Sequence, residues 1–194
     1  MDSLDNNTLI ALLAVAAVVI AVIAAIAWSS HQTRRLKNRF GPEYDAVLRR
    51  SGSKAKAEKE LRQRERRVEK FQIVPLSAAD VARFSNAWSR LQGSFVDDPK
   101  GVLIEADKLV RDLLNKRGYP VADFDLRAAD ISVDHPIVVD NYRAAQRIVS
   151  LDQRGEASTE DLRKAVVHFR ALFDELLGKT TADERMTPPT RLAA

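Results

Sequence analysis

The sequence predicts an all-α protein with an N-terminal transmembrane helix, a charged juxtamembrane helix and then a bundle of about four helices. Three observations carry this prediction: a run of twenty apolar residues near the N-terminus, apolar residues spaced by three and four further on, and no stretch that alternates apolar and polar residues as a strand would. The boundaries that follow are 1–8 for a short extracytoplasmic tail, 9–28 for the transmembrane helix, 29–75 for a basic stalk, 76–178 for the bundle and 179–194 for a disordered tail.

Charge is distributed in three blocks along the chain. The 194 residues carry a net charge of +4 and no cysteine, which excludes a disulfide scaffold, a thiolate metal site and a cysteine nucleophile. Residues 1–30 carry two charged side chains, residues 31–70 hold 14 Lys or Arg against 6 Asp or Glu, and residues 71–194 hold 17 against 19. A nearly uncharged block, a basic block and a nearly neutral block therefore follow one another.

The first block contains an uncharged run, residues 9–28, with the length of a membrane span. From Leu9 to Trp28 the chain is apolar without interruption, and a hydrocarbon core about 30 Å thick needs about 20 helical residues. Trp28 suits the membrane interface. A cleaved signal peptide, and hence an exported protein, is the alternative, because Ala25-Ile26-Ala27 has the small-x-small form of a cleavage site. The acidic N-terminal flank and the length of the run argue against cleavage.

The orientation of this span follows from its flanks. The N-terminal flank has no Lys or Arg, whereas Arg34, Arg35, Lys37 and Arg39 follow Trp28 closely. The positive-inside rule places the N-terminus outside and the C-terminal domain in the cytoplasm. These four cations are expected to contact anionic lipid headgroups at the membrane surface.

The remainder of the basic block is predicted to form two helices. Gly41-Pro42 and Ser51-Gly52-Ser53 are breaks, and residues 54–70 read as a solvated, charged helix. We interpret a set of its cations as contacts for lipid or for a partner protein, against the alternative of a soluble stalk: Arg62, Arg64, Arg66 and Arg67. Nucleic acid is disfavoured, because no aromatic residues are interleaved with these cations for base stacking.

Four long helices are predicted within 76–178. They begin at Ser77, Asp98, Asp134 and Ser158, which are N-cap residue types, and a short helix is expected around 123–129. The side chains expected in the core are Val81, Phe84, Trp88, Leu91, Phe95, Leu103, Ala106, Val110, Leu113, Leu114, Val138, Tyr142, Ala145, Val149, Leu162, Val166, Phe169, Phe173 and Leu176.

The sequence indicates no catalytic, cofactor-binding or metal-ligating residues. The three histidines lack a second His or Cys at ligand spacing. Asp123-x-Asp125 resembles the opening of a calcium loop, but Arg127 stands at its fifth position. Tyr119 is the candidate for an exposed contact. An enzyme with an unrecognised site in the acidic connection 123–134 stays open as an alternative.

Four short stretches carry a resemblance to a family of small bacterial single-pass membrane proteins with a helical soluble domain. They are 40–45 (FGPEYD), 95–99 (FVDDP), 117–120 (RGYP) and 155–162 (GEASTEDL). The resemblance covers the chain from the basic flank to Gly178. It implies the same architecture in a bacterial inner membrane, and it carries no activity or site residues.

The favoured hypothesis is a membrane-anchored helical protein-interaction module, an adaptor or scaffold that binds another protein or a second copy of itself, without a cofactor. One alternative is a sensor of anionic lipid at the membrane surface, which would use the cations at 62–67. The other is the enzyme with a site at 123–134.

Overall fold

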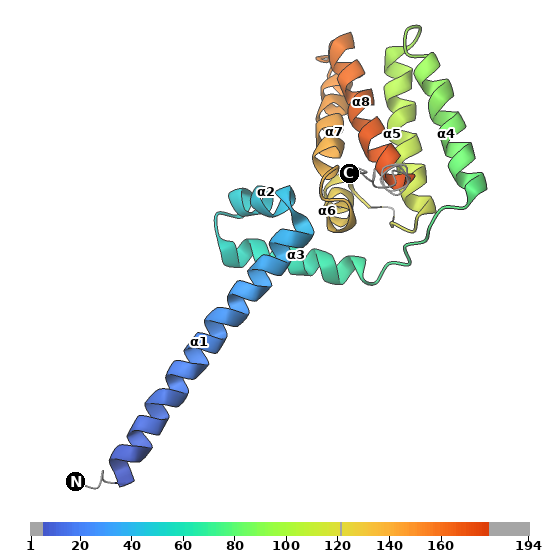
Figure 1. The fold of residues 1–194 in the computed structure, drawn as a ribbon. Coiled ribbons are helices and arrows are strands. Elements are labelled where there is room, and N and C mark those ends of the chain that lie inside the picture. Colours follow the sequence, from blue (N-terminus) through green and yellow to red (C-terminus); the bar gives the residue numbers. More distant parts are fainter. Residues whose placement is uncertain (1–5, 121, 179–194) are drawn as a thin grey trace, which may run out of the picture. The chain divides into compact units, whose positions relative to one another are not determined.

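The computed structural model describes residues 6–120 and 122–178, and within these residues it is entirely helical, without a strand (Figure 1). This confirms the predicted all-α class. The helices are α1 (Asn6–Phe40), α2 (Pro42–Ser51), α3 (Lys54–Val68), α4 (Ala78–Gly93), α5 (Pro99–Lys116), α6 (Phe124–Asp134), α7 (Val139–Gln153) and α8 (Thr159–Leu176). The predicted disordered tail 179–194 and residues 1–5 of the predicted N-terminal tail lie outside the described residues.

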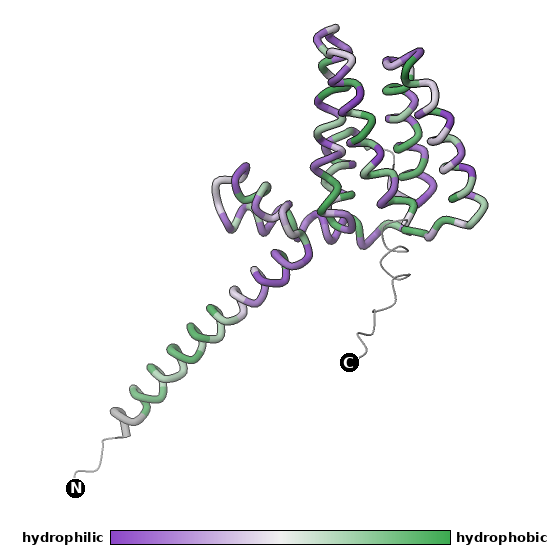
Figure 2. Tube along the Cα trace, turned by 45° about the horizontal axis from the view of Figure 1, so that its top comes forward, coloured by the Kyte–Doolittle hydropathy of each residue, from purple (hydrophilic) through white to green (hydrophobic). Residues whose placement is uncertain are grey.

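Helix α1 contains the apolar run and continues beyond it. Within the described residues one helix, Ile10–Phe40, is long and apolar enough to cross a membrane. The helix changes from apolar to polar after Trp28, as the shift from green to purple in Figure 2 shows. It ends at Phe40 because Gly41 adopts a left-handed φ of 46° and Pro42 begins α2.

The chain divides into two compact units, the first ending at Glu58 and the second starting at Lys59. In the first unit the buried carboxylate of Glu58 links the elements. Its Oε1 accepts hydrogen bonds from the hydroxyls of Thr33 on α1 (2.7 Å) and Tyr44 on α2 (3.2 Å), and it lies 3.8 Å from Nζ of Lys54. Burial, with the negative charge of Glu58 as a second cause, raises the pKa of Tyr44.

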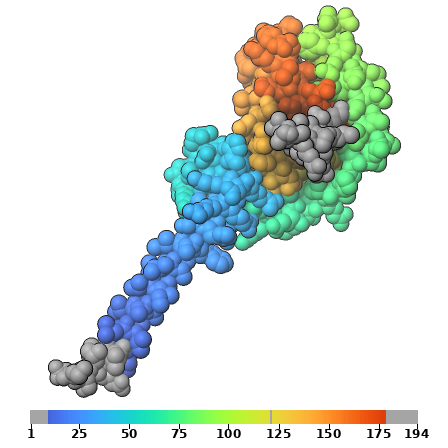
Figure 3. All heavy atoms as spheres, viewed as in Figure 1, coloured from blue at the N-terminus to red at the C-terminus, as the bar shows by residue number. Residues whose placement is uncertain are grey.

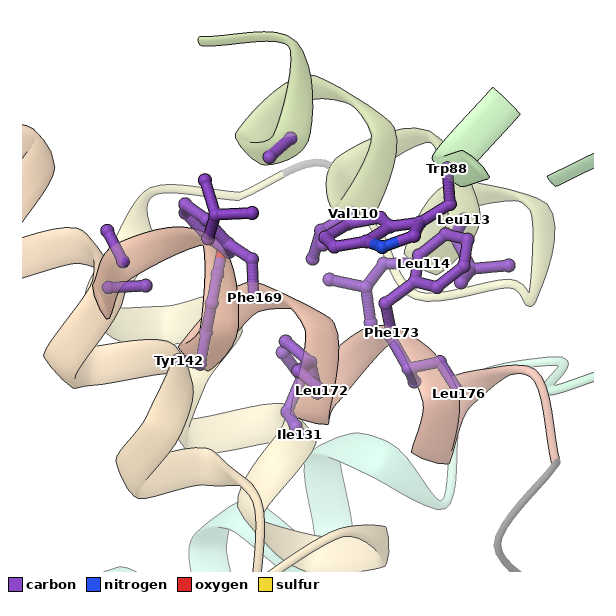
Figure 4. Close-up of a cluster of buried hydrophobic side chains, with 14 of the residues drawn as sticks. Trp88, Val110, Leu113, Leu114, Ile131, Tyr142, Phe169, Leu172, Phe173 and Leu176 are labelled. Carbon is purple, nitrogen blue, oxygen red and sulfur yellow. The ribbon is translucent and has the colours of Figure 1, made fainter. Parts of the chain in front are cut away.

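The second unit is built around α8, which packs against both α5 and α7, while α4 packs against α5 and α6 against α7. Trp88 of α4 stacks on Phe173 of α8 at 4.5 Å between ring centroids (Figure 4). Every side chain that the helical spacing places in the core belongs to this one cluster, either fully buried or packed against it as a partly buried residue. Trp88, which the spacing places in the core, is 1% exposed.

Helix starts agree with the predicted caps at three positions. The side chains of Ser77, Asp98 and Ser158 accept hydrogen bonds from backbone N–H groups three residues ahead, and Ser158 with Asp161 forms a complete capping box.

The expected start of a helix at Asp134 is wrong, because Asp134 is the last residue of α6 and α7 begins at Val139. Helix α6 extends further than expected because Asp123 caps its start and its residues 131–133 are buried. The expectation that Tyr119 is exposed is also wrong. Its ring is 2% exposed, and its hydroxyl donates to Oδ2 of Asp134 at 2.9 Å.

Candidate functional site

The most extensive candidate surface is the apolar part of α1. Its large apolar side chains from Ile10 to Trp28 are 50–71% exposed. Burying apolar surface stabilises by about 25 cal/mol per Å², so an exposed surface of this length is unfavourable in water. Monomeric soluble proteins rarely expose a continuous patch this large. This part of α1 is therefore long and apolar enough to cross a membrane.

The four cations predicted to meet lipid headgroups all lie on the polar C-terminal part of α1. Arg34, Arg35, Lys37 and Arg39 are exposed, and Nζ of Lys37 lies 5.3 Å from the ring centre of Tyr44. They follow the exposed apolar segment on the same helix. A membrane that accommodates the segment would place its surface near them, and their role in lipid binding stays a prediction.

The second set of cations, on α3, is split between buried and exposed positions. Arg64 is 3% exposed. Its guanidinium donates to Oγ of Ser132 on α6 at 2.8 Å and to Oε1 of Glu60 at 2.6 Å. Arg67 donates to Oδ1 of Asp130 on α6 at 2.6 Å. These two arginines therefore connect α3 to α6 within the second unit.

The remaining members of the set stay closer to solvent: Arg66 is exposed and Arg62 is half-buried. The interpretation of residues 54–70 as a solvated helix is thus wrong at Arg64 and at Glu65, each of which is 3% exposed. No local signal could have shown this, because the groups that Arg64 and Arg67 reach on α6 lie more than sixty residues ahead in the chain.

Asp130, the buried partner of Arg67, is one of the acidic residues in the connection 123–134. Burial raises the pKa of its carboxyl, and the hydrogen bond and charge of Arg67 oppose that rise. The other acids of this connection have separate structural roles. Asp123 caps α6 through the backbone N–H of Leu126, and Asp134 accepts from Tyr119.

A polar cluster that the sequence did not indicate lies between α5, α6 and α7. Arg127 donates to the hydroxyl of Tyr142 at 2.7 Å and to the carbonyl of Ala122 at 2.5 Å. Asp107 is 8% exposed and pairs with Arg111 at 3.1 Å. Burial raises the pKa of Asp107, and the positive charges of Arg111 and Arg127 oppose this effect. A predicted spacing could not have found the cluster, because its members come from three helices.

The hollow beside this cluster is small. It has a volume of about 30 Å³ and is lined by residues that include Arg111, Tyr119 and Arg127. A buried water occupies about 10–15 Å³ by such a measure, so the hollow has room for about two. An enzyme site at 123–134 stays a prediction without a specific observation in its favour.

The two described histidines of the second unit each face one polar group. Nδ1 of His135 lies 3.1 Å from Oε1 of Glu175, and Nδ1 of His168 lies 2.9 Å from Oδ1 of Asn141. Among the residues that the structure describes, no group of three or more His, Cys, Asp or Glu side chains could hold a metal ion.

A groove runs between α4 and α5. The atoms of these two helices are in the green range of the colour bar in Figure 3. The groove consists of two hollows of about 490 and 620 Å³. Ala87 and Leu109 line both, so the two are continuous. Ile104 borders the larger hollow and is 61% exposed. This is the second surface of the molecule with the character of a binding site.

No protein-family model, curated protein or solved structure matches this chain. The family named from the sequence resemblance therefore stays a prediction.

Proposed function

We propose that this protein is a membrane-anchored helical protein-interaction module. In this proposal α1 is the single transmembrane anchor, α3 is the charged juxtamembrane helix, and α4, α5, α7 and α8 are the bundle of about four helices that carries the binding surface. The observation that carries the proposal is the exposure of every large apolar side chain of α1 from Ile10 to Trp28. Lipid is the solvent that removes this exposure without a further protein chain.

The proposed orientation has the N-terminus outside and the second unit in the cytoplasm of a bacterial cell, with the span in the inner membrane. It is supported by four exposed cations on one side of the span and by the absence of Lys and Arg from the sequence before it.

The test is a protease digest of spheroplasts that carry the full chain with a C-terminal tag. The tag should survive in intact spheroplasts, be lost on lysis, and stay with the membrane pellet after alkaline extraction. Digestion of the tag in intact spheroplasts would overturn the orientation, and release of the chain by alkali would overturn the anchor.

The interaction role is supported by the α4–α5 groove, which combines the exposed Ile104 with half-buried Leu91 and Leu109. Crosslinking in intact membranes followed by purification of the tagged chain should recover a complex. The complex should be weakened by Ile104→Glu and unaffected by Val167→Glu, which changes an apolar residue on α8 of similar exposure (55%, against 61% for Ile104). Recovery of the monomer alone would contradict the proposal.

A second candidate function, sensing of anionic lipid, is supported by the exposure of Arg66 and the partial exposure of Arg62. A chain lacking residues 1–30 should then bind vesicles that contain phosphatidylglycerol more tightly than vesicles of phosphatidylcholine. Replacement of both arginines by Gln should weaken this binding, which falls with added salt. Equal binding by the double variant and by an Arg147→Gln control would contradict lipid sensing.

A further inference from the structure

The groove between α4 and α5 has oppositely charged walls. Consecutive antiparallel helices form it, so each level along it pairs one residue of α4 with one of α5. Arg90 and Glu105 line the larger hollow, and Arg83 and Asp112 line the smaller one. Arg83 and Arg90 on α4 therefore stand opposite Asp112 and Glu105 on α5, seven residues apart in each case. Lys116 of α5 also lines the smaller hollow, and its charge is paired with Asp80 of α4 at 3.4 Å.

Only some of these charges form salt bridges within the chain. Arg90, Glu105 and Asp112 are exposed, and none of them forms a salt bridge with another described residue. Arg83 pairs with Asp80 on its own helix at 3.3 Å. At the level of Arg90 and Glu105, the groove thus presents an unpaired cation and an unpaired anion on opposite walls.

The apolar floor of the groove lies beside an exposed apolar side chain. Ala87 leaves space in both hollows because its side chain is a single methyl group. Ile104 projects next to that space and is 61% exposed. An isoleucine that faced this hollow from a second surface would bury apolar area on both sides.

A two-fold axis that runs along the groove would pair the opposite charges of two copies and bring their apolar surfaces together. Such an axis places α4 of one copy over α5 of the other at the same level. Arg90 then faces Glu105 of the second copy, and the pair occurs twice because the interface is isologous. Ile104 of each copy then faces the α4 wall at the level of Leu91, which lines the larger hollow together with Ala87. An axis across the groove would instead put α4 on α4, with cation against cation, which opposes association.

We propose that the α4–α5 groove is a homodimer interface, occupied by the same groove of a second copy of this chain with α4 over α5. The inference rests on the proposed function and deepens it by naming the partner. Membrane anchoring would favour the dimer, because two copies in one membrane meet at a higher effective concentration than in solution.

The test exploits the two-fold relation between Arg90 and Glu105. The full chain is reconstituted in lipid vesicles, and association is measured by energy transfer between donor and acceptor dyes on Gln153→Cys. This label site is unique because the chain has no cysteine. The variants are Arg90→Glu, Glu105→Arg and an equimolar mixture of the two. Arg147→Glu, an exposed position on α7, is the control with the same charge change.

The dimer predicts an unusual pattern. Arg90→Glu alone sets carboxylate against carboxylate at both symmetric contacts, and Glu105→Arg alone sets cation against cation, so each should associate at least about tenfold more weakly than the parent chain. In the mixture both contacts again join opposite charges, and energy transfer between the two variants should return to the parent level. The Arg147→Glu control should associate like the parent.

Two results would overturn the proposal. One is energy transfer in the parent chain that neither variant reduces, which places self-association elsewhere and leaves the interaction module intact. The other is a parent chain without energy transfer at any protein density. If crosslinking then recovers a different protein, and Ile104→Glu weakens its capture, the groove serves a heterologous partner. Circular dichroism of each variant confirms that the helices are retained.

Discussion

Gly118 is a residue whose single hydrogen side chain is required by its surroundings. Its φ of +95° lies in the left-handed region, and a Cβ there would stand 2.1 Å from the backbone carbonyl oxygen of Gln72. The segment that contains Gln72 is held at this place by the hydrogen bond from the N–H of Val74 to the carbonyl of Arg117, 2.9 Å long. An added methyl group therefore meets both backbone strain and a fixed backbone atom.

We expect Gly118→Ala to lower the free energy of unfolding by about 3 kcal/mol, which combines the cost of a positive φ with displacement of the 72–74 segment. Gly155→Ala is the matched control. It has a φ of +72° and no atom within 4 Å of the added Cβ, so its cost should be about 1 kcal/mol. Urea unfolding of both variants measures the difference. Equal losses would show that contact with Gln72 is unimportant.

Asp107 gives the unfolding free energy a dependence on pH with a defined sign. Burial raises the pKa of its carboxyl despite the charges of Arg111 and Arg127, so the folded state retains a proton that the unfolded state has released. The contribution of Asp107 to stability is therefore full below the ordinary pKa of an aspartate. It is lost as pH rises from there through the raised pKa.

Asp107→Asn should thus remove part of the decline in melting temperature across this window, and the variant should melt above the parent at neutral pH. Melting curves from pH 3.5 to pH 7 check the slope. Asp125→Asn is the control, since Asp125 is exposed in the first turn of α6. A parent slope that survives in Asp107→Asn would contradict the assignment.

At the scale of elements, the contact of Arg67 with Asp130 is one of the two that attach α3 to α6, and the contact of Arg64 with Ser132 is the other. Asp130 is 3% exposed, whereas the Arg67 side chain is 32% exposed. Removal of the arginine leaves a buried carboxylate without this partner. Because water has partial access to the pair, the free-energy cost is smaller than for a fully buried ion pair. We expect Arg67→Ala to lower the unfolding free energy by about 2 kcal/mol.

The loss of stability in Arg67→Ala should be seen locally in α3 as well as in the free energy of global unfolding. Amide hydrogen exchange should accelerate in residues 59–68 of α3 while the core residues of α5 and α8 stay protected. Arg66→Ala, the adjacent exposed residue on the same helix, should leave both exchange and stability within about 0.5 kcal/mol of the parent. Similar exchange in the two variants would show that the contact with Asp130 does not hold α3.

The elements that local chemistry specifies were predictable from the sequence, and those that distant contacts specify were not. Ser158 and Asp161 lie three residues apart and form the capping box expected of them, and the spacing of Phe169 and Phe173 identified their core positions. Tyr119 and Arg64 are different. Each is polar enough for the surface and is nevertheless buried, Tyr119 within the hydrophobic core, and its hydrogen-bond partner, Asp134 or Ser132, is not connected to it by any local pattern. The Asp107–Arg127–Tyr142 cluster escaped prediction for the same reason.

At the scale of the whole molecule, the proposed orientation depends on a charge difference between the two ends of one apolar segment. Before the segment stand Asp2 and Asp5, without a Lys or Arg, and after it stand four exposed cations. Because Lys and Arg near a span set its direction and Asp and Glu contribute little, removal of the cations alone should give a mixed population. Removal of these cations combined with new cations at the N-terminus should invert the orientation of the chain in the membrane.

The decisive variant therefore combines Asp2→Lys and Asp5→Lys with Gln at positions 34, 35, 37 and 39. In spheroplasts its C-terminal tag should become accessible to protease, whereas the tag of the parent chain stays protected. A chain with Gln at the four positions but native Asp2 and Asp5 is the control and should be partly digested. If the inverted charge pattern leaves the tag protected, the second unit resists translocation whatever its flanks carry. The cytoplasmic placement would then follow from the stability of that unit rather than from the basic residues at the end of α1.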